Sequence, residues 1–221
     1  MLYRKTKFDK MLPMKLREHG LLFHFIDVLF NIVVIVAIVA GIRTFLVSPF
    51  QVEGNSMVDT LEDKQYIIIN KLAYILGDPK RGDVVVFRPP SDQEKYYVKR
   101  VIGLPGDTVS IRGGFVYLQK AGEKEDKQLE EDPYLNDRND GHTYNHPPSS
   151  GNTKEVSYEV PKGSYFLLGD NRQGSLDSRS FQMEGSDLTP YVPADDIKGR
   201  VWFVALPITK IHALEPPDYG F

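Results

Sequence analysis

A long apolar stretch near the start of the chain constrains the possible folds more than any other sequence feature. It covers residues 21–42, and its second half, residues 32–42, contains no polar side chain. With the residues that follow, it has roughly 20–25 mainly apolar positions, about the number that a helix needs to cross a bilayer core. Asp27 and Arg43 fit this interpretation if they lie near the two membrane interfaces. We therefore expect a transmembrane anchor over residues 21–47.

Two other interpretations of this stretch stay open. A helix buried in a protein core usually shows a polar face, which residues 32–42 lack. A cleaved signal peptide usually has a shorter basic region, and a small-residue cleavage site follows its apolar core. A single uncleaved anchor fits the pattern best.

The charges divide the chain into two parts of opposite sign. Residues 1–20 carry six basic and two acidic side chains, a net charge of +4. Because the whole chain carries −3, the remaining 201 residues carry −7, which argues against a general nucleic-acid-binding surface. Basic residues before a span favour a cytoplasmic N-terminus. We expect a single-pass protein of the cell (plasma or inner) membrane, with a basic cytoplasmic tail over 1–20 and an extracytoplasmic domain over 48–221.

After residue 50 the sequence favours β structure. Short β-branched and aromatic runs alternate with turn residues, whereas helical periodicity is scarce. We expect strands at residues 65–70, 83–87, 96–102, 108–111, 115–118, 165–168 and 200–205. Residues 119–160 form a polar stretch with ten acidic and five basic side chains, which we expect to be a surface insertion or a mobile loop. The predicted fold is mainly β, an antiparallel β domain of mixed sheets with one N-terminal transmembrane helix.

The chain has no cysteine, so disulfides, thiol nucleophiles and thiolate metal sites are excluded. Hydroxyl and amine groups in three polar segments are the remaining candidates for catalysis. The first segment is GNSM at residues 54–57, in which Ser56 follows an extended stretch soon after the anchor. A lone serine is usually a turn or cap residue. As a nucleophile it needs a base to take its proton and backbone N–H groups to bind the oxyanion.

The second segment is YYVKRVIGLPGD at residues 96–107. Alternation along a strand puts Lys99 on one face together with Tyr97 and Val101. A strand lysine usually extends into water, but burial would lower the pKa of its amine from about 10.4 to roughly 7–8 and make it a general base. The third segment, GDNRQGSLDSR at 169–179, is typical of a solvated loop or of an ion-paired scaffold that holds Ser175.

Together the three segments resemble the type I signal peptidases, a family of membrane serine proteases with a Ser/Lys dyad. VEGNSM at 52–57 is similar to the nucleophile box of that family, and RGDVVVF at 81–87 is similar to the strand that follows it. KRVIGLPGD at 99–107 matches the lysine box, and residues 169–179 match the last box. The boxes occur in order over about residues 48–207, and residues 119–160 lie outside the match.

The resemblance implies a role for each box. Ser56 is the expected nucleophile and Lys99 its general base. The expected supporting residues are Ser175, which hydrogen-bonds the lysine amine, and the ion pairs Asp177–Arg179 and Asp170–Arg100. The expected substrate contacts are Gln51, Val52, Glu53, Gly54, Met57, Tyr96, Tyr97 and Val98. The family's β domain lies on the membrane through a hydrophobic face, which suits Trp202 and Phe203, although both side chains suit a core equally well.

Two positions depart from the family pattern. Asp59 stands where the family usually has a proline, so we expect altered stiffness of the loop rather than lost chemistry. Gly54 stands where some members have a serine whose hydroxyl assists the oxyanion hole. Backbone N–H groups, chiefly that of Ser56, must then bind the oxyanion.

The implied function is removal of signal peptides from exported preproteins by a membrane-bound serine endopeptidase, a hydrolase. We expect no cofactor, no metal and no nucleic-acid partner; the expected partners are preproteins and the lipid bilayer, and the protein is expected to be a monomer. Alternatives are an inactive or specialised relative with one dedicated substrate, and a membrane-anchored β-domain scaffold without catalysis. His142 and His146 have the spacing of metal ligands on a helix, but they lie in a stretch where we expect no helix.

Overall fold

The computed structural model describes residues 14–58, 60–144, 155–181 and 188–219. The chain divides into two compact units between Phe45 and Leu46. The first unit is helical, and the second is built mainly from β-strands.

The helical unit consists of one long apolar helix. Helix α1 (Met14–Gly41) continues as a π-helical segment over Ile42–Leu46. Gly20–Leu46 has a mean hydropathy of 2.7 over its most apolar window, and none of that window is buried. Apolar side chains on all sides of a long helix are typical of a membrane span, because a surface helix of a globular protein shows one polar face. By length and composition, this helix is suited to cross a membrane.

The larger sheet of the β unit is antiparallel and has the strand order β1-β2-β11-β3-β4-β9-β10, with β12 paired to β11. Its strands are β1 (Val47–Gln51), β2 (Tyr66–Asn70), β3 (Val84–Phe87), β4 (Tyr97–Gly103), β9 (Ser164–Leu168), β10 (Val192–Pro193), β11 (Ile197–Leu206) and β12 (His212–Ala213). Strand β4 pairs with β3 on one side and β9 on the other, and Val85 lies opposite Lys99. The lysine therefore comes from the interior of the sheet rather than from an edge.

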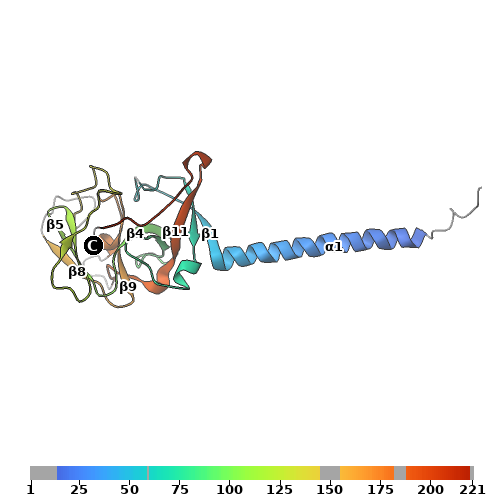
Figure 1. The fold of residues 1–221 in the computed structure, drawn as a ribbon, viewed down its shortest axis with the longest axis horizontal. Coiled ribbons are helices and arrows are strands. Elements are labelled where there is room, and N and C mark those ends of the chain that lie inside the picture. The colour runs from blue at the N-terminus through green and yellow to red at the C-terminus, as the bar shows by residue number, and fades with distance from the viewer. Residues whose placement is uncertain (1–13, 59, 145–154, 182–187, 220–221) are drawn as a thin grey trace, which may run out of the picture. The chain divides into compact units, whose positions relative to one another are not determined.

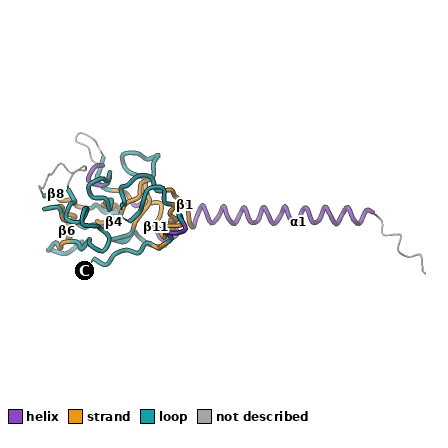
Figure 2. Tube along the Cα trace, turned by 90° about the horizontal axis from the view of Figure 1, so that it is seen from above, coloured by secondary structure: helices purple, strands orange, loops and turns teal. Residues whose placement is uncertain are grey.

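The smaller sheet is also antiparallel and has the order β7-β6-β5-β8. Its strands are β5 (Thr108–Arg112), β6 (Phe115–Gln119), β7 (Lys127–Gln128) and β8 (Val156–Glu159). This sheet and β1 lie at opposite ends of the β unit in both views (Figures 1 and 2). The short helical segments are α2 (Ser178–Phe181) and the 3-10 turns Leu72–Tyr74, Ala194–Asp196 and Ile208–Lys210.

Apolar side chains fix the loop that carries Ser56 to the larger sheet. All four residues of β3 are buried, as expected for a central strand that is covered on both faces. Met57 and Leu61, from the loop after β1, pack into the core cluster of β2 and β11. A second cluster joins the two sheets, with Val109 of β5 and Phe166 of β9 among its members. The loop that carries Ser56 is thus held by its own buried side chains.

The predicted fold class is confirmed, because the chain is mainly β with one apolar N-terminal helix. All seven predicted strands are present, with ends that differ by three residues at most. Trp202 is 49% exposed and therefore does not belong to the core, whereas Phe203 is partly buried.

The stretch at residues 119–160, which we expect to be a surface insertion or a mobile loop, contains both exposed turns and packed segments in the part that the structure describes. Strands β7 and β8 lie within it and pair with the smaller sheet. Leu129, Glu131 and Leu135 are buried, and Leu129 belongs to the cluster that joins the sheets. Three of its few apolar side chains, Leu129, Leu135 and Val160, are buried, and the polar composition of the stretch gives no sign of this packing. Residues 145–154 of the stretch lie outside the described residues.

We expect Leu129→Ala to lower the free energy of unfolding by about 2–4 kcal/mol, because it leaves a cavity in a closed core. Leu76→Ala is the matched control, since Leu76 is 79% exposed. That control should change stability by less than about 0.5 kcal/mol. Urea unfolding of the full chain in detergent, followed by near-ultraviolet circular dichroism, measures both variants. Equal stability of the two variants would contradict a packed role for this segment.

Candidate active site

The loop after β1 carries Ser56 and is closed at its base by hydrogen bonds. The Val52 N–H donates to the Gln65 carbonyl at 2.8 Å. Gly54 has a φ of +85°, a conformation that favours glycine, and its N–H donates to the Asp63 carboxylate at 2.8 Å. These contacts hold the backbone immediately before Ser56 in one conformation.

Lys99 approaches this loop from β4. Its side chain is buried, with 3% of the residue exposed, and its Nζ lies 2.6 Å from the Ser56 Oγ and 2.8 Å from the Val98 carbonyl oxygen. The amine also lies 5.5 Å from the ring centroid of Tyr97, its neighbour on the same face of the strand. The structure therefore brings together the two residues that the sequence marks as nucleophile and base.

Burial lowers the pKa of Lys99 from its ordinary 10.5 to about 8. Loss of hydration is the largest cause, because it disfavours the charged amine. The carboxylates of Asp177 and Asp170 oppose this effect, while the guanidinium of Arg179 adds to it. With this pKa, roughly a tenth of the amine is neutral at pH 7 and about half at pH 8, and the neutral form can accept a proton.

The loop after β9 packs directly on the backbone of Ser56. The Asn171 N–H donates to the Ser56 carbonyl at 3.1 Å, and the Asn171 side-chain amide donates to the Asn55 carbonyl at 2.9 Å. A Cβ on Gly169 would lie 2.5 Å from the Ser56 carbonyl oxygen and 2.6 Å from the Ser175 Cβ, so only glycine fits there. This close approach fixes the position of Ser56 relative to residues 169–179.

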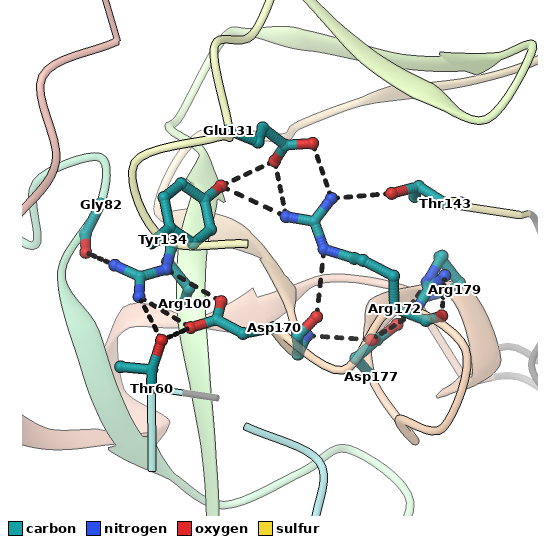
Figure 3. Close-up of polar contacts among 11 residues, drawn as sticks. Thr60, Gly82, Arg100, Glu131, Tyr134, Thr143, Asp170, Arg172, Asp177 and Arg179 are labelled. Carbon is teal, nitrogen blue, oxygen red and sulfur yellow. Dashed lines mark hydrogen bonds and ion pairs between the residues drawn. The ribbon is translucent and has the colours of Figure 1, made fainter. Parts of the chain in front are cut away.

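Both ion pairs expected in this loop are present, and both are buried (Figure 3). The Arg100 guanidinium donates to the two Asp170 oxygens at 2.9 and 2.7 Å, and the Thr60 hydroxyl donates to the same carboxylate at 2.5 Å. Arg179 donates to Asp177 at 2.8 and 2.7 Å. Burial raises the pKa of Asp177, but its contacts with Arg179 and the Gly169 N–H outweigh burial, so the pKa lies below its ordinary value.

The expected hydrogen bond between Ser175 and Lys99 is not formed. Ser175 is buried, and within the described residues its Oγ contacts the Asp177 carboxylate, whose pKa it helps to lower, rather than the Lys99 amine. Its side chain lies against the Cα of Gly169, in the space that a larger residue at 169 would occupy. The Lys99 amine instead contacts Ser56 and the Val98 carbonyl.

A cleft of about 520 Å³ opens in front of Ser56 and Lys99. The residues that the sequence marks as substrate contacts all line it: Gln51, Val52, Glu53, Gly54, Met57, Tyr96, Tyr97 and Val98. Lining residues that the sequence did not mark are Phe50, Asn55, Val86, Lys95, Gly174 and Leu176. The ring of Phe50 meets the ring of Tyr96 edge-on, with centroids 5.3 Å apart, and so connects the two walls of the cleft.

The family model described as signal peptidase, peptidase S26, matches residues 25–206 of the chain. The chain belongs to this family. The resemblance that the sequence motifs predict is therefore confirmed, and the protein is a hydrolase of the serine endopeptidase class.

Similar proteins come from several bacteria. Signal peptidase I P of Bacillus subtilis subsp. natto is 36% identical over 190 residues, which cover 82% of this chain and 88% of the relative. Signal peptidase I of Pseudomonas aeruginosa is 34% identical over 221 residues, covering 86% and 74%. Signal peptidase IB of Staphylococcus aureus is 33% identical over 202 residues, covering 85% and 93%.

Three parts of this signal peptidase site could not be identified from its motifs. Asn171 lies in the last box but looks like any loop amide, and Thr60 lies in a turn where a hydroxyl is ordinary. Glu131 and Tyr134 come from the polar stretch outside the boxes, and no local signal distinguishes them from its other polar residues.

Asp59, the departure from the family pattern, lies outside the described residues, as does His146. His142 is exposed, and its ring Nδ1 lies 2.7 Å from the Asp140 carbonyl oxygen.

We expect Lys99→Met to stabilise the folded chain at neutral pH. Because the folded pKa of Lys99 is about 8 and the ordinary value is 10.5, the unfolded chain binds the additional proton between these two pH values. Stability therefore rises with pH across this window in the unchanged chain. At pH 7 we expect Lys99→Met to raise the free energy of unfolding by about 1–3 kcal/mol, since the cost of burying the charge is gone.

Urea unfolding of the full chain in detergent at pH 7 and pH 10 measures this difference. The increase in the free energy of unfolding caused by Lys99→Met should become smaller towards pH 10. Lys198→Met, on the partly exposed face of β11, is the control and should follow the unchanged chain at both pH values. A Lys99→Met variant that is less stable than the unchanged chain at pH 7 would contradict the cost of burying this amine.

Proposed function

We propose that this chain removes signal peptides from exported preproteins, with Ser56 as the nucleophile and Lys99 as the general base. The observation that carries the proposal is the 2.6 Å contact between the Lys99 Nζ and the Ser56 Oγ, formed by a buried amine with a pKa of about 8. A general base must be within hydrogen-bond reach of the proton that it takes, and its pKa must lie near the working pH. Lys99 meets both conditions.

The proposed reaction has two stages. Neutral Lys99 accepts the Ser56 proton while Oγ attacks the carbonyl carbon of the scissile bond, and the resulting ammonium then protonates the leaving amine. The ester that remains on Ser56 is hydrolysed by a water molecule, which loses its proton to the same lysine. The Ser56 backbone N–H stabilises the oxyanion of each tetrahedral intermediate, and one such donor is worth about 3–4 kcal/mol.

The substrate is proposed to bind as an extended strand. The cleft lies between residues 51–54 on one side and residues 96–98 on the other, so a peptide can make main-chain hydrogen bonds with both. Small side chains next to the scissile bond, the pattern of signal-peptide cleavage sites, are proposed to bind beside Ser56 and Met57. The ion pairs Asp170–Arg100 and Asp177–Arg179 are proposed to hold residues 169–179 against Ser56.

Residues 21–47 are proposed to anchor the enzyme in the membrane, with residues 1–20 in the cytoplasm and residues 48–221 outside. The exposed apolar surface of Gly20–Leu46 and the net charge of +4 over residues 1–20 support this orientation. An anchor confines the enzyme to the plane in which preproteins emerge from the membrane. Nothing in the proposed reaction needs a second copy of the chain, so we propose a monomer.

The test is cleavage of a bacterial preprotein by the full chain in detergent. We expect Ser56→Ala and Lys99→Ala to lower kcat/KM by at least about 1,000-fold, because each removes half of the dyad. Lys99→Arg should be equally inactive, since a guanidinium keeps the positive charge but does not release a proton near neutral pH.

Ser110→Ala and Lys198→Ala are matched controls that lie outside the cleft and should keep full activity. Cleavage at the unchanged rate by Ser56→Ala or by Lys99→Arg would disprove the dyad.

A further inference from the structure

The polar stretch at 119–160 contributes a buried carboxylate, Glu131, which contacts the loop at residues 169–179. Glu131 is 3% exposed, and its carboxylate accepts two hydrogen bonds from the Arg172 guanidinium, at 2.8 and 2.5 Å. Arg172 is 1% exposed and lies within residues 169–179. Figure 3 shows the two side chains meeting end to end, with Thr143 as a further acceptor for Arg172 at 2.8 Å. Stability alone does not explain this buried ion pair, because apolar residues of similar volume are often equally or more stabilising. We therefore consider a functional role for it.

We propose that Glu131 is a positioning residue that fixes the Ser56–Lys99 pair through two linked arms, one through Arg172 and one through Tyr134, whose hydroxyl also accepts a hydrogen bond from Arg172 at 3.3 Å. This inference rests on the proposed function, because it assigns Glu131 to the same reaction.

The first arm runs through Arg172 to the loop that packs on Ser56. The Arg172 Nε donates to the Gly169 carbonyl at 3.1 Å, and Gly169 packs so closely on Ser56 that a Cβ at this position would lie 2.5 Å from the Ser56 carbonyl oxygen. The Arg172 carbonyl in turn accepts a hydrogen bond from Arg179 at 3.0 Å. Arg172 therefore ties the start of the loop to the Asp177–Arg179 pair at its end. Glu131 binds the guanidinium through two hydrogen bonds and so holds it in the orientation in which its Nε reaches the Gly169 carbonyl.

The second arm runs through Tyr134 to the other ion pair. The Tyr134 hydroxyl donates to the Glu131 carboxylate at 2.7 Å, and the Arg100 guanidinium lies over the Tyr134 ring, 4.1 Å from its centroid. Arg100 binds Asp170, which also accepts from Thr60 in the loop of Ser56. One carboxylate thus restrains both ion pairs that border the dyad, and Arg100 lies next to Lys99 in β4.

We expect loss of the Glu131 charge to shift the loop at residues 169–179 and the Ser56 backbone, while the chain still folds. Without the carboxylate, Arg172 keeps Thr143, the Tyr134 hydroxyl and the Gly169 carbonyl as acceptors but loses the counter-charge that binds it directly. The guanidinium is then driven towards water, and residues 169–171 move with it. A displacement of the Ser56 backbone by a fraction of an ångström is enough to lower the rate, because the dyad contact is short.

The experiment compares Glu131→Gln with Asp107→Asn in the full chain. Asp107 is also 3% exposed and pairs with Arg81 at 2.8 Å, but its other partners are the backbone N–H groups of Leu104 and Ala121, outside the site. Both variants lose one buried carboxylate charge. We expect Glu131→Gln to lower kcat for preprotein cleavage by at least 10-fold with KM changed less than 3-fold, and Asp107→Asn to keep kcat.

The pH profile separates positioning from loss of stability. A loosened loop admits water to Lys99, so the acidic limb of kcat/KM should move to higher pH in Glu131→Gln and stay in place in Asp107→Asn. Tyr134→Phe keeps the stacked ring but removes the hydroxyl that donates to Glu131 and accepts from Arg172, so it tests the proposal even if Glu131→Gln does not fold. We expect a fall in kcat of about 3-fold for Tyr134→Phe, because the link from Glu131 to Tyr134 is lost while the ion pair of Glu131 with Arg172 remains.

Each outcome decides the inference. An unchanged kcat in folded Glu131→Gln, an unchanged kcat in Tyr134→Phe, or equal losses in Glu131→Gln and Asp107→Asn would overturn it. The unchanged chain and Ser56→Ala are measured alongside. Cleavage that does not depend on Ser56 would refute the proposed function itself, and that result is distinct from a failure of the positioning role.

Discussion

A lysine amine buried beside a serine hydroxyl is the constraint on which the rest of the site depends. Such an amine must either find a carboxylate partner or lose its proton, because an unpaired buried charge is costly. Two carboxylates, Asp170 and Asp177, act on Lys99, yet each is bound by an arginine of its own. The arginines therefore keep the carboxylates from becoming partners of the lysine, and burial then holds the pKa of Lys99 near 8. The two ion pairs serve the chemistry by leaving the amine unpaired.

The same logic explains why the site draws on parts of the chain that are far apart. The interior strand β4 supplies Lys99, and the loop after β1 supplies Ser56. The loop after β9 packs on the backbone of Ser56. Three arginines and three carboxylates, buried together, can coexist only if every charge is matched and oriented. Glu131 completes this set by pairing with Arg172, the one arginine of residues 169–179 without a carboxylate in its own loop.

The features that can be predicted from the sequence are those that depend on residues close together in the chain. Alternation of apolar residues locates the strands, and the motif around Lys99 locates the base because that motif is contiguous. The ion pairs Arg100–Asp170 and Asp177–Arg179 follow from the family motifs. The partnership of Glu131 with Arg172 does not, because 41 residues separate the two in the chain and Glu131 lies among many exposed acids. The orientation of Ser175 also escapes prediction, since it depends on the close packing around Gly169 rather than on residue type.

The protonation of Lys99 in the folded chain tests this account most directly. Lysine labelled with carbon-13 at Cε allows the titration of Lys99 to be followed by NMR in detergent, with Lys99→Arg to assign its signal. We predict a midpoint at about pH 8, as burial without a partner requires. A midpoint near the ordinary value of 10.5 would mean that the amine is hydrated or paired, and would contradict the central claim.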